Sequence, residues 1–200
     1  MSHFDLIRQQ ACEFRREILG ETFDELTSAE SLLFAAESST RIRRLGLEKG
    51  DVMLYGASAV LDENIIYFDK TLPANHALFC QAHEYAHFRL HEMSAHCTPE
   101  EINFSAAETD SFNVESRVLG YGESEKTERE ANVFAAEFLL PCDSARKAFA
   151  EDKLNASQIA RKTGLPVNLV YSQLAQSLIS MENGKWKMEN EAIPKSEIRN

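Results

Sequence analysis

The chain has 200 residues, of which 44% are hydrophobic and 26% are charged, proportions typical of a packed domain rather than of a disordered chain. Its 32 acidic residues exceed its 21 lysines and arginines, so a formal net charge of -11 leaves no global positive field to hold phosphate backbones or anionic lipid. No window approaches the roughly 18 to 20 consecutive apolar residues that cross a bilayer, and residues 1–17 lack the basic-then-apolar pattern of a signal peptide. Composition therefore favours a cytoplasmic protein and disfavours direct nucleic-acid binding and membrane insertion.

Cysteine and histidine are distributed differently along the chain. The four cysteines are scattered with no CxxC spacing, which in a reducing compartment favours buried thiols over a disulfide framework. Five of the six histidines lie between positions 76 and 96. This clustering makes that segment the first candidate for a functional site.

Two helices are predicted near the N-terminus. Apolar residues recur at steps of three and four over residues 4–18, the spacing of one buried helix face, and Gly20 ends the run. A second helix is predicted over about 28–46. Its last turns contain three basic residues, Arg41, Arg43 and Arg44. Because cations interact favourably with the C-terminal end of a helix dipole, we interpret the three as a C-terminal cap rather than a binding patch.

A small antiparallel sheet is predicted next. Short runs of β-branched and aromatic residues occupy positions 52–56, 58–62 and 65–69. Glu63 and Asn64 separate the last two runs as a tight hairpin connection. After Pro73, a long helix is predicted over 75–91, and it contains most of the histidines.

The remainder of the chain is predicted to be mainly helical. Residues 94–127 are polar and rich in acids, and we interpret them as irregular or weakly stranded. A strong helix is predicted over 124–139, where Pro141 ends it, and a shorter one over about 143–151. Residues 155–178 are typical of a helix, a Gly-Leu-Pro turn and a second helix.

Positions 83–87 read HEYAH, an H-E-x-x-H pattern on a segment that is predicted to be helical. Residues four apart on a helix lie about 40° apart in angle and one turn apart in height, so His83 and His87 can reach one metal ion. Zinc with three protein ligands keeps an open position for a water whose pKa falls to about 7, and Glu84 lies where it can take the proton of that water. The pattern predicts peptide-bond hydrolysis but needs a third ligand. The alternative is a helix whose histidines occupy a solvated or half-buried face.

A candidate third ligand lies on the helix predicted over 124–139. Glu128 is followed four residues later by Asn132, so a carboxylate and an amide that could orient a ligating imidazole share one helix face. Glu130 lies about 200° around the helix from Glu128 and would face elsewhere, so both cannot be ligands. The alternative for either glutamate is an exposed surface acid.

The sequence resembles the ImmA/IrrE-type zinc metallopeptidases, gluzincin-like proteases that cut helix-turn-helix repressors in bacteria and mobile elements. HEYAHFRLH at 83–91 is similar to the family's HExxH-xxx-H run, and EREANVFAAEFLLP at 128–141 is similar to its E-x-x-A-N-x-F-A-x-x-L-L-x-P signature. The resemblance covers about residues 28–180. Ala86 stands where the family often has glycine, and the long acidic segment between the two motifs is a larger departure.

The resemblance implies a role for each residue of the two motifs. It makes His83, His87 and Glu128 the zinc ligands and Glu84 the general base. Asn132 would then support a ligand by hydrogen bonding.

Two further residues lie close to the predicted site along the helix. His91, one turn after His87, could support the site or contact substrate, and a partly buried structural histidine is the alternative. Cys80, one turn before His83, could close the site as a fourth ligand, but packing in the core is favoured. Tyr85 points away from the ligand face by helical angle and is predicted to lie in the core.

We therefore predict an α+β fold, a mostly helical gluzincin-like metallopeptidase core with a small antiparallel sheet and a C-terminal helical segment. Residues 1–150 would form the zinc metallopeptidase domain, 151–182 a small helix-turn-helix-like subdomain and 183–200 a polar, flexible tail. The subdomain is locally basic, so it could bind DNA; packing on the protease or docking of a protein partner is the favoured alternative.

The function predicted from these residues is that of a cytoplasmic zinc-dependent endopeptidase with one Zn²⁺ per chain, or Mn²⁺ in the cell. Its partner would be a protein substrate, a DNA-binding repressor cleaved to trigger a stress, defence or mobile-element response. The acids between Glu100 and Glu125 are expected to border the cleft and favour a basic substrate segment. The alternative is a non-catalytic regulatory or antitoxin-like binding protein on the same fold.

Overall fold

The computed structural model describes residues 2–91, 96–97 and 123–182. Within these residues the chain forms seven α-helices, two single-turn 3-10 helices and a small sheet, so the predicted α+β, mostly helical fold is confirmed. The helices are α1 (His3–Leu19), α2 (Ala29–Thr40), α3 (Ala74–Leu90), α5 (Glu123–Leu139), α6 (Cys142–Ala150), α7 (Ala156–Thr163) and α8 (Val167–Glu182). The strands are β1 (Arg43–Leu47), β2 (Ala59–Asp62), β3 (Ile65–Asp69) and β4 (His96–Cys97), and the 3-10 helices are η1 (Gly20–Thr22) and η2 (Val52–Leu54).

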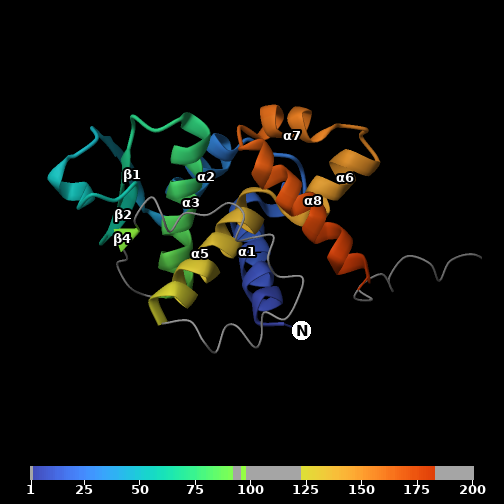
Figure 1. The fold of residues 1–200 in the computed structure, drawn as a ribbon, viewed down its shortest axis with the longest axis horizontal. Helices are drawn as coiled ribbons and strands as arrows, with labels where there is room; N and C mark the ends of the chain where they lie inside the picture. The colour runs from blue at the N-terminus through green and yellow to red at the C-terminus, as the bar shows by residue number, and fades with distance from the viewer. Residues whose placement is uncertain (1, 92–95, 98–122, 183–200) are drawn as a thin grey trace, which may run out of the picture.

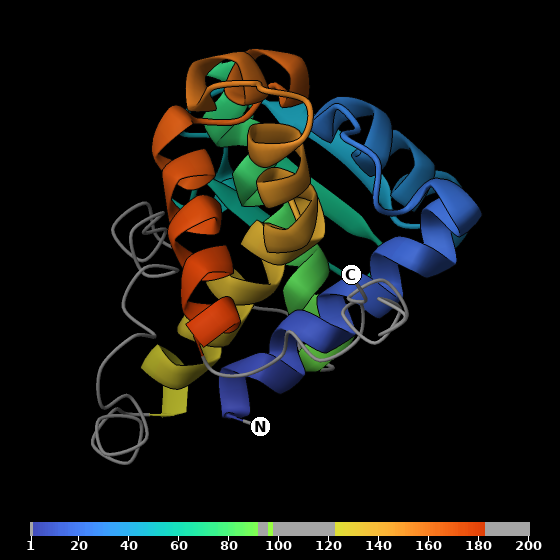
Figure 2. The same cartoon turned by 90° about the vertical axis from the view of Figure 1, so that its right-hand side faces the viewer.

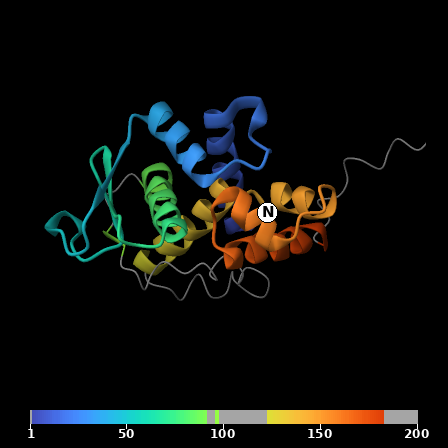
Figure 3. The same cartoon turned by 90° about the horizontal axis from the view of Figure 1, so that it is seen from above.

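Helices α3 and α5 lie between the sheet and the C-terminal helices (Figures 1 and 3). In both views the strands are on one side of α3, and α6 to α8 are on the other. Figure 2, seen from the side of α6 to α8, has the strands behind the helices. Helix α5 packs most extensively against α3 and α1. The two helices that carry the predicted motifs therefore lie side by side in the middle of the molecule.

The sheet is mixed, and the predicted antiparallel sheet is wrong at one pairing. Its strand order is β1-β3-β2-β4. Strands β2 and β3 form the predicted antiparallel hairpin through Glu63 and Asn64, but β1 pairs with β3 in parallel, with Arg43 opposite Ile65. The parallel pairing arises because a segment predicted as helix enters the sheet beside β3.

The second helix ends earlier than predicted. Arg41 takes a left-handed conformation with φ 64°, and its N–H closes the last turn of α2 on the carbonyl of Glu37. Ile42 then turns into the core, where it is fully buried, and the chain continues as β1 instead of as helix. Arg41 is therefore the C-cap residue of α2, but through its backbone, and the prediction is wrong for Arg43 and Arg44, which lie in β1 because burial of Ile42 outweighs continuation of the helix.

The predicted strand at 52–56 is also wrong. Residues Val52–Leu54 form the single turn η2, which begins where the Asp51 carboxylate accepts a hydrogen bond from the N–H of Met53 at 3.0 Å. Val52 and Tyr55 are exposed and only Leu54 is buried, so this run of apolar residues does not have the face of a strand. Local capping by Asp51 here outweighs β-propensity.

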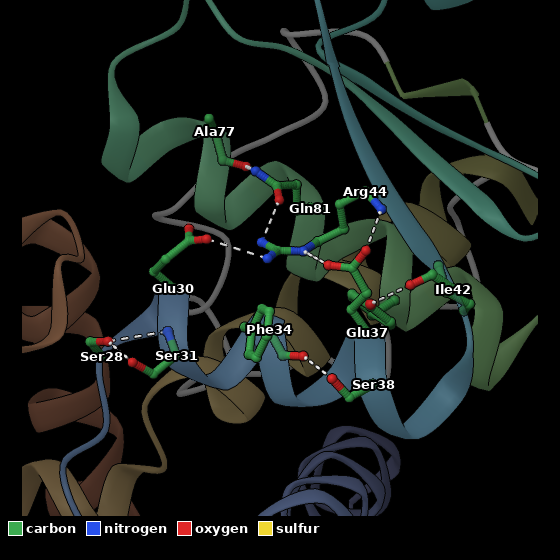
Figure 4. A network of polar contacts seen from close by, with 11 residues as sticks. Ser28, Glu30, Ser31, Phe34, Glu37, Ser38, Ile42, Arg44, Ala77 and Gln81 are labelled. Atoms are coloured by element: carbon green, nitrogen blue, oxygen red, sulfur yellow. Dashed lines mark hydrogen bonds and ion pairs between the residues drawn. The ribbon is translucent and has the colours of Figure 1, made fainter.

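Arg44 joins the sheet to the helices beneath it (Figure 4). Its side chain is 9% exposed, and its guanidinium donates to Glu37 Oε2 and Glu30 Oε1 on α2, each at 3.3 Å, and to Gln81 Oε1 on α3 at 3.0 Å. Gln81 in turn donates to the carbonyl of Ala77. This network lines part of a cavity of about 430 Å³ and fixes β1 against α2 and α3.

Aromatic rings and small residues build the core between α1, α3 and α5. Phe14 of α1 packs on Phe138 of α5 with ring centroids 5.1 Å apart, and Tyr85 of α3 packs on both rings. Tyr85 is fully buried, which confirms its predicted place in the core. Ala86 and Ala131 are also fully buried, and their small side chains allow α3 and α5 to approach closely.

The C-terminal helices are fixed to α5 through Glu137. This buried carboxylate accepts hydrogen bonds from Arg8 of α1 at 3.2 Å, from the N–H of Cys142 at the start of α6 at 3.1 Å, and from Gln173 of α8 at 3.0 Å. Ile159, Leu165 and Leu169 belong to the same buried cluster as the aromatic core. The boundary at residue 150 and the role of residues 151–182 stay predictions.

None of the helices in the described part of the chain combines the length and the hydropathy that crossing a bilayer requires. The predicted tail at 183–200 and nearly all of the acidic segment at 98–127 lie outside the described residues.

Candidate metal centre

His83 and His87 lie one turn apart on α3, as the H-E-x-x-H spacing predicts. Both side chains are fully buried, and their ring centroids are 4.7 Å apart. Their Nε2 atoms lie 2.9 Å from each other. The helical spacing therefore directs two imidazole nitrogens at the same small volume.

Helix α5 brings Glu128 to these two nitrogens. Glu128 Oε2 lies 3.1 Å from Nε2 of His83, and Oε1 lies 3.4 Å from Nε2 of His87. The three ligand atoms all fall within 4.8 Å of one another, and the group can hold a metal ion. The structure thus brings together the three residues predicted as ligands from two separate motifs.

Electrostatics favours a cation at this point. Burial by itself raises the pKa of Glu128, but the hydrogen bonds and charges of His83 and His87 outweigh it and hold that pKa well below its ordinary range. Burial also lowers the pKa of His87, so this imidazole is neutral at pH 7. The centre therefore contains a carboxylate that keeps its negative charge, which a divalent cation would neutralise.

Asn132 determines which nitrogen of His83 carries the proton. Its Oδ1 lies 3.0 Å from Nδ1 of His83, and an amide oxygen only accepts hydrogen bonds. This contact favours the tautomer of His83 that carries its proton on Nδ1, in which Nε2, the nitrogen that faces His87 and Glu128, has a lone pair for a metal ion. Asn132 is buried, with 2% of its surface exposed, so no water competes for this bond.

The donor set fits zinc. Two imidazole nitrogens and one carboxylate oxygen are a common ligand set of zinc sites that keep an open fourth position. Tetrahedral bonds of about 2.0–2.1 Å place ligand atoms about 3.3 Å from one another. Here the two Nε2 atoms lie 2.9 Å apart, Nε2 of His83 lies 3.1 Å from Oε2 of Glu128, and Nε2 of His87 lies 3.4 Å from Oε1 of the same carboxylate. An ion of this size is therefore accommodated with only small shifts of the side chains.

Glu84 is held by the sheet. Its side chain is completely buried, and its Oε2 accepts a hydrogen bond from the backbone N–H of Leu61 in β2 at 2.9 Å. A carboxylate that accepts a main-chain hydrogen bond is fixed in orientation. Strand β2 therefore positions the acid that the sequence predicts as the base, immediately beside His83 in the chain.

Glu130 faces away from Glu128, as the helical angle predicted, but it is not an exposed surface acid, the alternative that the sequence left open. It is 8% exposed, and its Oε2 lies 2.9 Å from Nε2 of His91 while its Oε1 lies 2.6 Å from Nε2 of His3 on α1. Burial raises its pKa, but the hydrogen bonds from His91 and His3 outweigh burial and lower it to about 2. Glu130 does leave α5 on a different side from Glu128, as predicted. On that side, however, it meets α1 and the end of α3 instead of solvent.

His91 lies directly behind the predicted ligand His87. Its Nδ1 is 3.1 Å from Nδ1 of His87, and 14% of its side chain is exposed. Of the roles that the sequence left open for His91, which were support of the site, contact with substrate and a structural role, this contact with His87 favours support of the site. Sequence reasoning missed Glu130 and His3 because only the packing of α1, α3 and α5 brings them to His91.

Cys80 does not belong to the metal-binding group. It is 3% exposed, and the group that could hold a metal ion in the described residues consists of His83, His87 and Glu128. Its burial agrees with the predicted packing role.

Comparison of the sequence with models of protein families finds no match, and comparison with curated proteins finds none either. The geometry of the centre and the two motifs are therefore the basis on which a function is proposed for this chain.

Proposed function

We propose that this chain is a cytoplasmic zinc-dependent endopeptidase with a gluzincin-like centre. The observation that carries the proposal is the convergence of His83, His87 and Glu128 on one point, together with the burial of Glu84 next to His83 in the H-E-x-x-H motif. A site built only to bind zinc has no use for Glu84 at that position, whereas hydrolysis needs a base there.

Each side chain has one task in this mechanism. A Zn²⁺ held by the three ligands would polarise the scissile carbonyl and lower the pKa of the attacking water. Glu84 would take the proton of that water and pass it to the leaving amine. The hydrogen bond from Leu61 keeps the Glu84 carboxylate in place, and Asn132 keeps His83 in the tautomer that ligates.

The substrate that we propose is a helix-turn-helix transcriptional repressor, cleaved to release a stress, defence or mobile-element response. Support comes from the resemblance of residues 83–91 and 128–141 to the ImmA/IrrE-type metallopeptidases. The net charge of -11 is compatible with a basic protein segment as substrate.

The test uses the purified full chain and the repressor encoded nearest to it. Bound metal is measured first, and cleavage is then followed for the wild type, Glu84→Gln and the control Glu63→Gln, which changes an exposed glutamate in the hairpin turn. We expect about one Zn²⁺ per chain in all three proteins. Loss of the base should slow cleavage by at least about 100-fold in Glu84→Gln alone.

Two results would contradict the mechanism: cleavage by metal-free protein, or an unimpaired rate in Glu84→Gln. If Glu84→Gln cuts nothing but still produces the wild-type response in cells, the function is that of a non-catalytic binding protein.

A further inference from the structure

Three residues from three helices form a hydrogen-bonded line behind His87. Starting from the ligand, Nδ1 of His87 faces Nδ1 of His91 at 3.1 Å, and Nε2 of His91 faces Glu130 Oε2 at 2.9 Å. The other oxygen of Glu130 is 2.6 Å from Nε2 of His3, near the start of α1. The ligand is thus connected through α5 to the first helix of the chain.

The directions of the hydrogen bonds follow from the chemistry of the groups. A carboxylate only accepts, so Glu130 keeps the single proton of a neutral His91 on Nε2. Nδ1 of His91 then has a lone pair and accepts, and the proton between the two Nδ1 atoms belongs to His87. In this arrangement Nε2 of His87 has a lone pair. This nitrogen lies 2.9 Å from Nε2 of His83 and 3.4 Å from Oε1 of Glu128, an acceptor that competes with His91 for the proton of His87.

We propose that Glu130, acting through His91, is a positioning residue that sets His87 in the tautomer that ligates the metal, and that His3 anchors this relay to α1. The inference rests on the metal site of the proposed function but not on its substrate. None of the three residues reaches the metal, so their effect is exerted on His87.

Burial makes the relay effective. The side chain of Glu130 is 10% exposed and that of His91 is 14% exposed, so water offers few competing partners. Lys126, one turn earlier on α5, lies 3.5 Å from Oε1 of Glu130 and adds a positive charge on the same side as His3. The two ligating histidines therefore have different supports: His83 depends on a neutral amide, and His87 depends on a carboxylate through a second imidazole.

The first experiment reads the tautomers directly. Imidazole nitrogen shifts are recorded by NMR on the metal-free wild type at pH 8, where unpaired imidazoles are neutral. We expect His87 to carry its proton on Nδ1 and His91 to carry its proton on Nε2. In His91→Phe, the His87 tautomers should become mixed, while His83, held by Asn132, should stay protonated on Nδ1 as an internal control.

The second experiment measures zinc affinity by competition with a chelating dye. We expect His91→Phe and Glu130→Gln to bind zinc about 10- to 100-fold more weakly than the wild type. His91→Gln, whose side-chain oxygen can accept the same bond from His87, should recover part of the loss. Glu63→Gln, on the surface, should bind like the wild type.

The inference is overturned if metal-free wild-type His87 is protonated on Nε2, or if His91→Phe and Glu130→Gln keep the wild-type affinity within about twofold. The wild-type spectrum tests the predicted His87 tautomer even if a variant fails to fold. Wild-type protein that binds zinc through this relay but cleaves nothing would refute the proposed function alone. Protein that binds no zinc would also refute the proposed function, and the tautomer of metal-free His87 would still test the relay.

Discussion

Nδ1 of His83 lies 3.0 Å from Oδ1 of Asn132, so a residue of α5 sets the protonation of a histidine on α3. The same helix, one turn earlier, places carboxylate oxygens of Glu128 within 3.4 Å of Nε2 of both His83 and His87. Helix α5 therefore supplies one candidate ligand, Glu128, and also Asn132, which orients a second candidate ligand, His83. The close packing of α3 on α5 is a condition for the centre and not only for the stability of the fold.

Replacing Asn132 by alanine should weaken zinc binding about 10- to 100-fold, because His83 loses the acceptor that keeps its proton on Nδ1. Dye competition measures this affinity. Asn168→Ala, at an exposed position of α8, is the matched control and should change nothing. Equal affinities in the two variants would mean that Asn132 does not support the ligand.

Removal of metal should lower the thermal unfolding temperature, because the centre joins α3 to α5 and is formed only in the folded chain. Zinc at about 100 times its dissociation constant is expected to add about 2.7 kcal/mol to the free energy of unfolding. Calorimetry with zinc and with a chelator measures the shift, which Glu128→Gln should reduce. Identical transitions in both conditions would argue against a metal site.

Arg8→Met should lower the free energy of unfolding by about 3–5 kcal/mol, because it leaves the Glu137 carboxylate buried without its guanidinium partner. Denaturant unfolding measures the change. Arg43→Met, at an exposed position of β1, is the control and should cost less than about 0.5 kcal/mol. A small effect of Arg8→Met would show that the hydrogen bonds from Cys142 and Gln173 are enough to stabilise the buried Glu137 carboxylate.

Stability should fall as the pH rises above 9. Burial raises the pKa of Cys80 from 9.0 to about 12, so the unfolded chain loses this proton first. The contribution of the thiol is therefore complete below pH 9 and is lost progressively between pH 9 and about 12. Unfolding free energies measured from pH 8 to 10.5 should decline less steeply for Cys80→Ala. If the unfolding free energies of the wild type and Cys80→Ala decline in parallel with pH, Cys80 is not the cause of the decline.

Helices and turns that depend on residues close by in the sequence could be predicted from the sequence alone. Hydrophobic periodicity and end signals predicted α1, α3, α5 and the C-terminal helices, and two turn residues predicted the hairpin between β2 and β3. The failure at β1 has a specific cause. Arginine is a good helix former, and only the burial of Ile42 and the pairing of Arg43 with Ile65, distant in sequence, draw this segment into the sheet.

The sequence by itself determined the candidate ligands, because the spacing of His83 and His87 on a helix is a local property and Glu128 lies in an equally distinct helical motif. Only the tertiary structure revealed that Glu130 and His3 support His91, since these residues come from three helices that no local pattern connects. Periodicity gives the angle at which a side chain leaves its helix. What it meets there depends on which helix packs alongside, and this is settled by burial of the shared core.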